Sequence, residues 1–216
     1  MYYPYIRQQV GRASRSITVV GHGEVFVEPD IATIQLEVQT ISERLREAQQ
    51  ENARIMNNVL QSLYQLGIPR ENIQTAAYTI FPRYDFINGE QVFRGYEVTN
   101  SISVKISDIL QVGTVIDTAV KNGANRVTSI QFAVEDVERP KQEAIVKALE
   151  NAQVKARTIA NALNLQIDPQ PVKIIEVENG GQPIPLLKAV AFESVTTPIE
   201  GGQISIRSTM RVQYEY

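Results

Sequence analysis

The sequence lacks several residue types on which common chemistries depend. Its 216 residues include no cysteine, no tryptophan and one histidine, His22. The absence of cysteine excludes disulfides, zinc–thiolate sites and thiol nucleophiles. No G-x-S-x-G or G-x-G-x-x-G motif occurs, which argues against an esterase-type serine and against a dinucleotide fold. Any catalytic or metal site that uses imidazole would therefore have to be built around His22.

Neither charge nor hydrophobicity is concentrated along the chain. The 21 Lys+Arg and 24 Asp+Glu give a formal charge of −3, without long runs of one sign, and this argues against broad binding to nucleic acid or anionic lipid. The apolar stretch at 184–192 is shorter than half a membrane span and contains Lys188, so we expect no membrane span. Residues 1–15 carry arginines but no apolar run of the secretory type. We expect them to form a flexible tail on a soluble, cytoplasmic protein.

Hydrophobic periodicity divides the rest of the chain into strands and helices, which we expect to form a single domain over 16–216. Clean alternation over 31–40 predicts a half-buried strand. Apolar residues at three- and four-residue steps predict helices over 40–67, 108–123 and 140–164. The apolar face expected for the third helix comprises Ile145, Leu149, Ala152, Ala156, Ile159 and Leu163.

Together these patterns predict an α+β fold: an antiparallel-rich sheet with three helices packed on one face. Similar phrases follow the first and third helices, LGIPRENI and LNLQIDPQPVKI, and suggest two related β-α-β halves. The segment 178–202 contains two Gly-Gly pairs and three prolines, so we expect a loop or flap there.

A long β-hairpin is predicted over 73–106, because Asn88-Gly89 favours a type I′ turn between two strand-like segments. A ribbon that protrudes from its sheet is marginally stable alone, so its apolar side chains should pack on something. We expect a contact with a second subunit, or else packing on the 178–202 flap. The predicted contact residues are Tyr78, Ile80, Tyr84, Phe86, Phe93 and Tyr96.

The stretch GHGEVFVEPDIATIQL, residues 21–36, gathers most of the potential chemistry. If Pro29-Asp30 is the corner of a hairpin, His22 lies opposite Glu37 on the outer face. A metal site formed by His22, Glu24 and Glu37 is one reading, since imidazole and carboxylates on adjacent strands can converge on one ion. A solvated strand face explains the same alternation without an ion. We therefore assign no catalytic, metal-binding or cofactor-binding residue.

The chain resembles the SIMPL family, long described as a domain of unknown function. Four phrases carry the resemblance and together cover nearly the whole chain from about residue 16: ITVVGHGEVFVEPDIATIQLEV, LGIPRENIQTAAYTIFPRYDF, GYEVTNSISVKISDILQVGTVIDTAVKNGAN and ALENAQVKARTIANALNL. The resemblance implies an α+β fold and homo-oligomers that form ring- or channel-like particles. It also implies a link to periplasmic immunogenic and oxidative-stress proteins of bacteria, and to an animal branch associated with a signalling kinase.

The sequence therefore predicts a non-enzymatic, self-assembling protein without a cofactor, with protection under oxidative stress implied by the resemblance alone. One alternative is a metal- or small-molecule-dependent enzyme that uses the face of His22, Glu24 and Glu37. Another is an adaptor that binds a different protein, whose identity the sequence does not indicate.

Overall fold

The computed structural model describes residues 15–177, 184–186 and 197–216. The described chain divides into two compact units. We call them the central unit, residues 27–136, 185–186 and 197–204, and the terminal unit, which contains residues 15–26, 137–177, 184 and 205–216. The predicted tail, residues 1–15, lies almost wholly outside the described residues, as does most of the predicted 178–202 flap.

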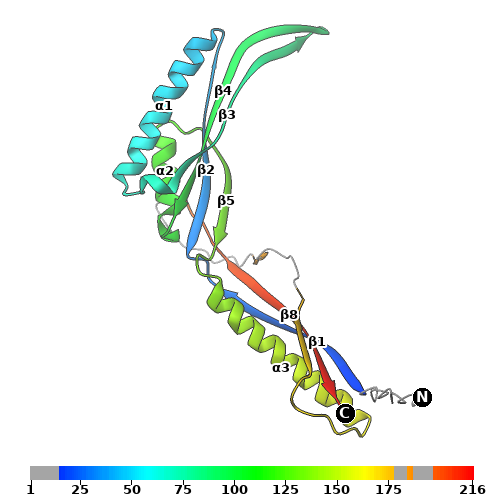
Figure 1. Ribbon diagram of the computed structural model, residues 1–216. Coiled ribbons are helices and arrows are strands. Elements are labelled where there is room, and N and C mark those ends of the chain that lie inside the picture. Colours follow the sequence, from blue (N-terminus) through cyan, green and yellow to red (C-terminus); the bar gives the residue numbers. More distant parts are fainter. Residues whose placement is uncertain (1–14, 178–183, 187–196) are drawn as a thin grey trace, which may run out of the picture. The chain divides into compact units, whose positions relative to one another are not determined.

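The central unit is built on a four-stranded antiparallel sheet of order β3-β4-β2-β5 (Figure 1). Its strands are β2 (Ile31–Ser42), β3 (Ile73–Ile87), β4 (Glu90–Ile106) and β5 (Arg126–Ala133). Strand β2 lies between β4 and β5, with Ile34 paired to Val104 on one side and to Ile130 on the other. Alternation along β2 places one set of its side chains on a single buried face.

Two helices cover that buried face, α1 (Leu45–Gln65) and α2 (Val112–Lys121). Short 3-10 turns, η1 (Arg70–Asn72) and η2 (Ile109–Gln111), follow the first helix and precede the second. Gly67 follows α1 with φ +88°, the left-handed conformation typical of the residue after a helix. The buried core is aliphatic and includes Ile34, Leu36, Val59, Leu63, Ile102, Val104 and Val115.

The terminal unit packs one helix on a second sheet. Strand β8 (Gln203–Glu215) lies between β1 (Ser16–Val27) and β6 (Lys173–Glu176), and β7 (Ile184–Leu186) also pairs with β8. Helix α3 (Glu138–Ala162) covers this sheet with alanines at every fourth position. The five buried alanines are Ala144, Ala148, Ala152, Ala156 and Ala160.

The α3 packing corrects the apolar face predicted for this helix. Ala152 and Ala156 are buried as expected, but Ile159 and Leu163 are 39% and 61% exposed. The reason lies in β1, where a Cβ added to Gly21 would lie 2.0 Å from the carbonyl oxygen of Ala148. The helix backbone approaches the strand so closely that only alanine fits between them.

The predicted α+β class, its three helices and its antiparallel strands are confirmed. The single sheet is wrong, because the strands form two sheets, and helices α1 and α2 cover one while α3 covers the other. The single domain over 16–216 and the two related halves stay predictions. Within the described part of the chain, no helix combines the length and the apolar character needed to cross a membrane.

Candidate functional site

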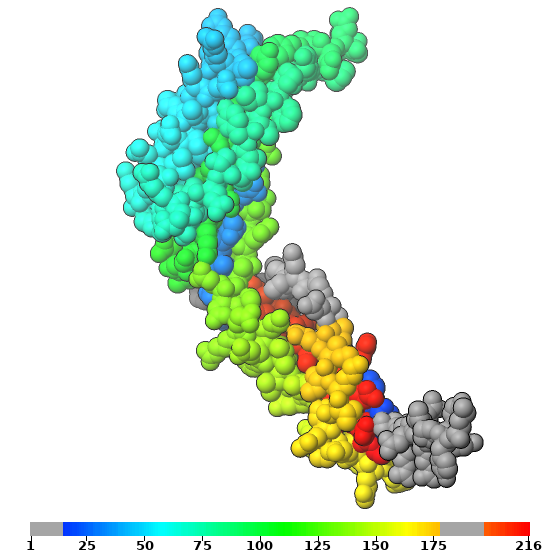
Figure 2. Space-filling model, viewed as in Figure 1, coloured from blue at the N-terminus to red at the C-terminus, as the bar shows by residue number. Residues whose placement is uncertain are grey.

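The predicted hairpin is present and, among the described residues, it joins the two longest strands, β3 and β4. Asn88 and Gly89 both have positive φ, 54° and 85°, as a type I′ turn requires. Beyond the part of the sheet that α1 covers, the two strands continue as a narrow arm (Figures 1 and 2). The arm therefore exposes both of its faces.

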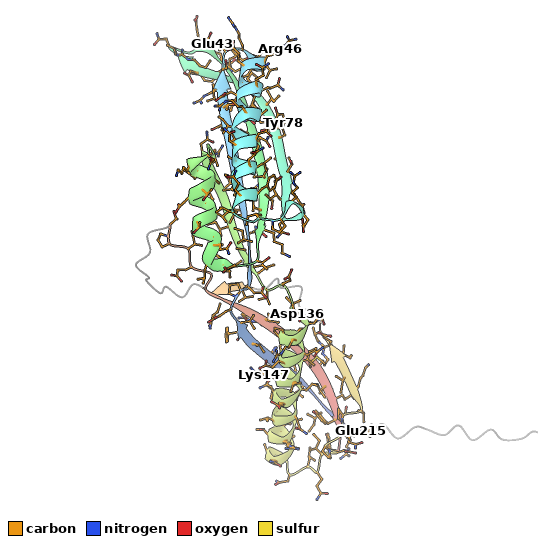
Figure 3. The ribbon with its side chains drawn as sticks, turned by 90° about the vertical axis from the view of Figure 1, so that its left-hand side faces the viewer. Glu43, Arg46, Tyr78, Asp136, Lys147 and Glu215 are labelled. Atoms are coloured by element: carbon orange, nitrogen blue, oxygen red, sulfur yellow. The ribbon has the colours of Figure 1, made fainter. Side chains whose placement is uncertain are left out.

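Strand pairing brings the predicted contact residues onto one face of the hairpin. Tyr84 is paired with Phe93, and Ile80 is paired with Val98, whose side chain is buried in the central unit. Because alternate residues of β3 point the same way, Tyr78 and Phe86 share this face. Figure 3 shows Tyr78 on the hairpin next to α1. The aromatic face thus continues the apolar side of the sheet beyond the cover of its helices.

The aromatic rings interact with each other but stay exposed to solvent. Phe93 makes edge-to-face contacts with Tyr84 and Tyr96, with ring centroids 5.6 and 5.3 Å apart. Phe86 is nevertheless 75% exposed, and Tyr84 and Phe93 are 45% and 42% exposed. Such a cluster of large exposed apolar side chains is typical of an interaction surface.

The opposite face of the hairpin is mostly polar. Arg83 lies 3.9 Å from Glu97, and Arg94 donates to Asp85 at 2.8 Å. Phe81 and Ile87, paired with Glu97 and Glu90, are large apolar residues on that side and are 61% and 44% exposed. The two faces of the same ribbon therefore differ in chemistry, and the aromatic face is the candidate binding surface.

A bulge at Gly95, which sequence analysis missed, sets the position of the hairpin arm. The pairing register shifts between Arg83 and Tyr84, and Gly95 has φ +121°. A Cβ at Gly95 would lie 2.5 Å from the carbonyl oxygen of Ser42, at the end of β2. Only glycine satisfies both conditions, and an isolated glycine within a predicted strand is the signal that could have revealed the bulge.

A groove of about 300 Å³ lies between α1 and the base of the hairpin. It adjoins the aromatic face, because Asn100 in its wall is the pairing partner of Tyr78. The lining is mixed, with methionine, leucine and isoleucine beside two asparagines and a threonine. The residues that line it are Ala53, Met56, Asn57, Leu60, Tyr64, Ile73, Thr75, Asn100 and Ile102.

The second candidate surface, around His22, differs from its prediction. His22 lies in β1 of the terminal unit, whereas Glu37 lies in β2 of the central unit and faces Arg126 at 3.5 Å. The predicted β1–β2 hairpin is wrong because β4 and β5 occupy both edges of β2. The proposed group of His22, Glu24 and Glu37 is therefore not assembled on one strand pair.

On the outer face of the terminal sheet, β1 contacts β8 through polar side chains. His22 Nδ1 lies 3.3 Å from Thr209 Oγ1. The Glu24 carboxylate accepts hydrogen bonds from Ser205 Oγ at 2.5 Å and from Arg207 Nε at 2.8 Å. These two donors lower the pKa of Glu24, chiefly through the Ser205 bond, against a smaller opposing effect of desolvation. A carboxylate held ionised in this way is a weak proton acceptor, so the group suits cross-strand pairing better than base catalysis.

No group of three or more His, Asp or Glu side chains that could hold a metal ion occurs among the residues that the structure describes. The metal reading of the His22 face therefore gains no support from the geometry.

Fold and surface together define an α+β protein with two helix-covered antiparallel sheets and an exposed aromatic hairpin. The chain belongs to the SIMPL family, described as proteins of unknown function (DUF541), whose model matches residues 17–214. The predicted resemblance is confirmed.

Several named relatives are similar to most of the chain. A Brucella melitensis protein named 26 kDa periplasmic immunogenic protein is 27% identical over 92% of this chain and 84% of its own length. The Escherichia coli K12 protein named Uncharacterized protein YggE is 25% identical over 82% of this chain and 72% of its own. A human protein named Interleukin-1 receptor-associated kinase 1-binding protein 1 is 25% identical over 82% and 65%.

These names correct one prediction. The expected cytoplasmic location is wrong, because Brucella relatives are named as periplasmic proteins, which points to export. The inference rested on the composition of residues 1–15, which is a weaker guide to location than similarity along the whole chain. None of the names quoted above describes a catalytic activity.

Proposed function

We propose that this chain is an exported, non-enzymatic protein that assembles with copies of itself through the aromatic face of the β3–β4 hairpin. One observation carries the proposal: Tyr78, Tyr84, Phe86 and Phe93 are each at least 42% exposed and lie on one face of the hairpin, whose tip continues as an arm beyond the helices. Aromatic residues are enriched where protein surfaces meet. Burial against a second copy removes this face from water without any change in the fold.

A closed symmetric assembly suits such a surface. The aromatic face and its charged reverse are different surfaces, so a contact between one hairpin and another part of a neighbour is heterologous and closes into a ring when the rotation permits. This supports the ring- or channel-like assembly that the family resemblance implies. Export is supported by the names of the Brucella relatives. Protection under oxidative stress rests on the family resemblance.

The test is the mass of the intact chain in solution, measured by light scattering at micromolar concentration. The wild-type mass should be a multiple of 24.2 kDa. Tyr84→Ser with Phe86→Ser should reduce it to one subunit while circular dichroism stays unchanged. Phe81→Ser, a similar loss of exposed ring on the opposite face, is the matched control and should leave the assembly intact.

A wild-type chain that runs as a monomer would overturn the proposal. A monomer that binds a different protein in a stoichiometric complex would favour the adaptor, an alternative supported by the name of the human binding protein. A metal ion that raises the melting temperature of the wild type, but not of His22→Ala, would favour the metal-dependent enzyme.

A further inference from the structure

Strand β1 has one edge that no other strand pairs with in the described part of the chain, since β8 is its neighbour on the other side. An open edge exposes a row of backbone N–H and C=O groups, which can pair with a strand of another molecule. Within β1, the backbone groups of alternate residues point to the same edge. The contacts of Val20, His22 and Glu24 therefore show which groups satisfy the backbone N–H and C=O of the open edge.

Three side chains of α3 hydrogen-bond to those three residues. Lys155 Nζ donates to the Val20 carbonyl at 2.8 Å. The His22 N–H donates to Asn151 Oδ1 at 3.1 Å, and Lys147 Nζ lies 3.4 Å from the Glu24 carbonyl (Figure 3 shows Lys147 on α3). Along these three contacts, the residue number in β1 falls by two each time the residue number in α3 rises by four.

The spacing of these contacts follows from the geometry of the two elements. Two strand residues advance about 6.6–6.8 Å, and four helical residues advance about 6 Å. A helix that runs along a strand in the opposite direction therefore stays in register with it for two such steps. The short asparagine occupies the middle, and the flexible lysines at either end absorb the remaining mismatch of roughly an ångström.

The glycines of β1 make this arrangement possible. A Cβ at Gly21 would lie 2.0 Å from the Ala148 carbonyl oxygen, and one at Gly23 would lie 1.9 Å from that of Ala144. The helix thus lies close enough to the strand for the side chain of Asn151 to reach past its face to an N–H group on its edge. The GHG stretch is a packing motif in this fold, with His22 between two points of helix contact.

We propose that Lys147, Asn151 and Lys155 protect the open edge of β1 from pairing with β1 of a second copy of the chain. The three side chains occupy the carbonyl and N–H groups that an added strand would need. Lys155 also places a positive charge there, and Lys147 adds a second that is shared with Glu143 at 3.3 Å. Lysine at an exposed edge is a common protection against edge-to-edge association. The partner excluded is a second β1, because two copies can pair their edges antiparallel about a two-fold axis.

The test uses the triple variant Lys147→Ala, Asn151→Ala and Lys155→Ala in the full chain, in the presence of Tyr84→Ser and Phe86→Ser so that hairpin contacts do not mask the result. In sedimentation velocity, this variant should associate at a concentration about tenfold or more below that of the Tyr84→Ser, Phe86→Ser protein that keeps Lys147, Asn151 and Lys155. The reason is that several backbone hydrogen bonds become available for pairing. Lys121→Ala with Arg139→Ala removes two positive charges from exposed positions on helices α2 and α3 and should cause no association.

His22→Pro distinguishes edge pairing from association through the new alanine surface. It removes the N–H that Asn151 accepts from, and proline is tolerated where an edge N–H faces outward. Added to the triple variant, it should abolish the new association. Amide hydrogen exchange provides a second measurement that does not depend on folding of the proline variant: residues 16–27 of the triple variant should gain protection as concentration rises. No new association, association that survives His22→Pro, or protection that does not depend on concentration would each overturn the proposal.

Discussion

His22 donates its backbone N–H to the side-chain oxygen of Asn151 across 3.1 Å, although the two residues are 129 positions apart in the chain. The contact exists because α3 lies almost directly on β1, with the backbone of the helix against Gly21 and Gly23. The only histidine of the chain is therefore placed by packing, and its main-chain group contacts the helix while its ring faces β8.

The first prediction concerns these glycines. Gly21→Ala and Gly23→Ala should each lower the free energy of unfolding by about 1–3 kcal/mol, because the new methyl group forces α3 away from the strand. Urea unfolding followed by circular dichroism measures the loss. Thr18→Ala, at an exposed position of the same strand, should change stability by less than about 0.5 kcal/mol. Equal effects at Thr18 and Gly21 would contradict the close approach of the helix.

The second prediction is a pH dependence at Glu24. Hydrogen bonds from Ser205 and Arg207 lower its pKa below the ordinary value of 4.5. A carboxyl whose pKa is lower in the folded state contributes stability above its unfolded pKa and loses it as the pH falls through the folded pKa. Glu24→Gln should therefore be less stable than wild type near neutral pH, and the difference should shrink on the acid side of 4.5.

Urea midpoints recorded from neutral to acid pH test this prediction. Glu28→Gln, which removes an exposed carboxyl outside the Ser205–Arg207 group, serves as the control. A constant difference between Glu24→Gln and wild type at all pH values would show that the hydrogen bonds do not depend on the charge of Glu24.

Much of the fold could be predicted because its signals are local. The α1 periodicity, Gly67 after the helix and the Asn88-Gly89 turn each depend on neighbours within a few residues. Strand partners are not local. The alternation of β1 fits any partner that leaves one face buried, and the choice of β8 over β2 was set by residues nearly 200 positions away.

The candidate surfaces likewise include one that local sequence signals predict and one that depends on distant contacts. The aromatic residues of β3 and their partner Phe93 follow from parity along β3 and from one turn, so they could be identified in the sequence, whereas the place of Tyr96 on this face depends on the register shift at Gly95. The edge contacts of Lys147, Asn151 and Lys155 could not, because their four-residue spacing becomes meaningful only once α3 lies on β1. Such a spacing alone is common on the solvent face of any helix.

The third prediction concerns the bulge that positions the hairpin arm. Gly95→Ala introduces a side chain where φ is +121° and where its Cβ would lie 2.5 Å from the Ser42 carbonyl oxygen. Backbone strain of this kind costs about 1–3 kcal/mol. The midpoint of thermal unfolding should fall, whereas Gly201→Ala, whose neighbours are side chains, should lower it less. Similar losses in both variants would argue against the bulge.

The last prediction concerns Asn52, a fully buried amide on α1. Its Nδ2 donates to the carbonyl oxygens of Val38 and Val98, at 2.8 and 3.1 Å, and so links the helix to β2 and β4. Asn52→Ala leaves both carbonyls without this donor and should cost about 2–3 kcal/mol of unfolding free energy.

Asn52→Asp keeps the shape of the side chain but places a carboxyl group in the buried core. Because burial raises the pKa of such a carboxyl, this variant should lose stability as the pH rises, the opposite trend to that of Glu24. Asn58→Ala, exposed on the same helix, is the control. Urea titrations at acid and neutral pH separate these outcomes, and an Asn52→Asp variant as stable as wild type at neutral pH would show that the amide does not hold α1 to the sheet.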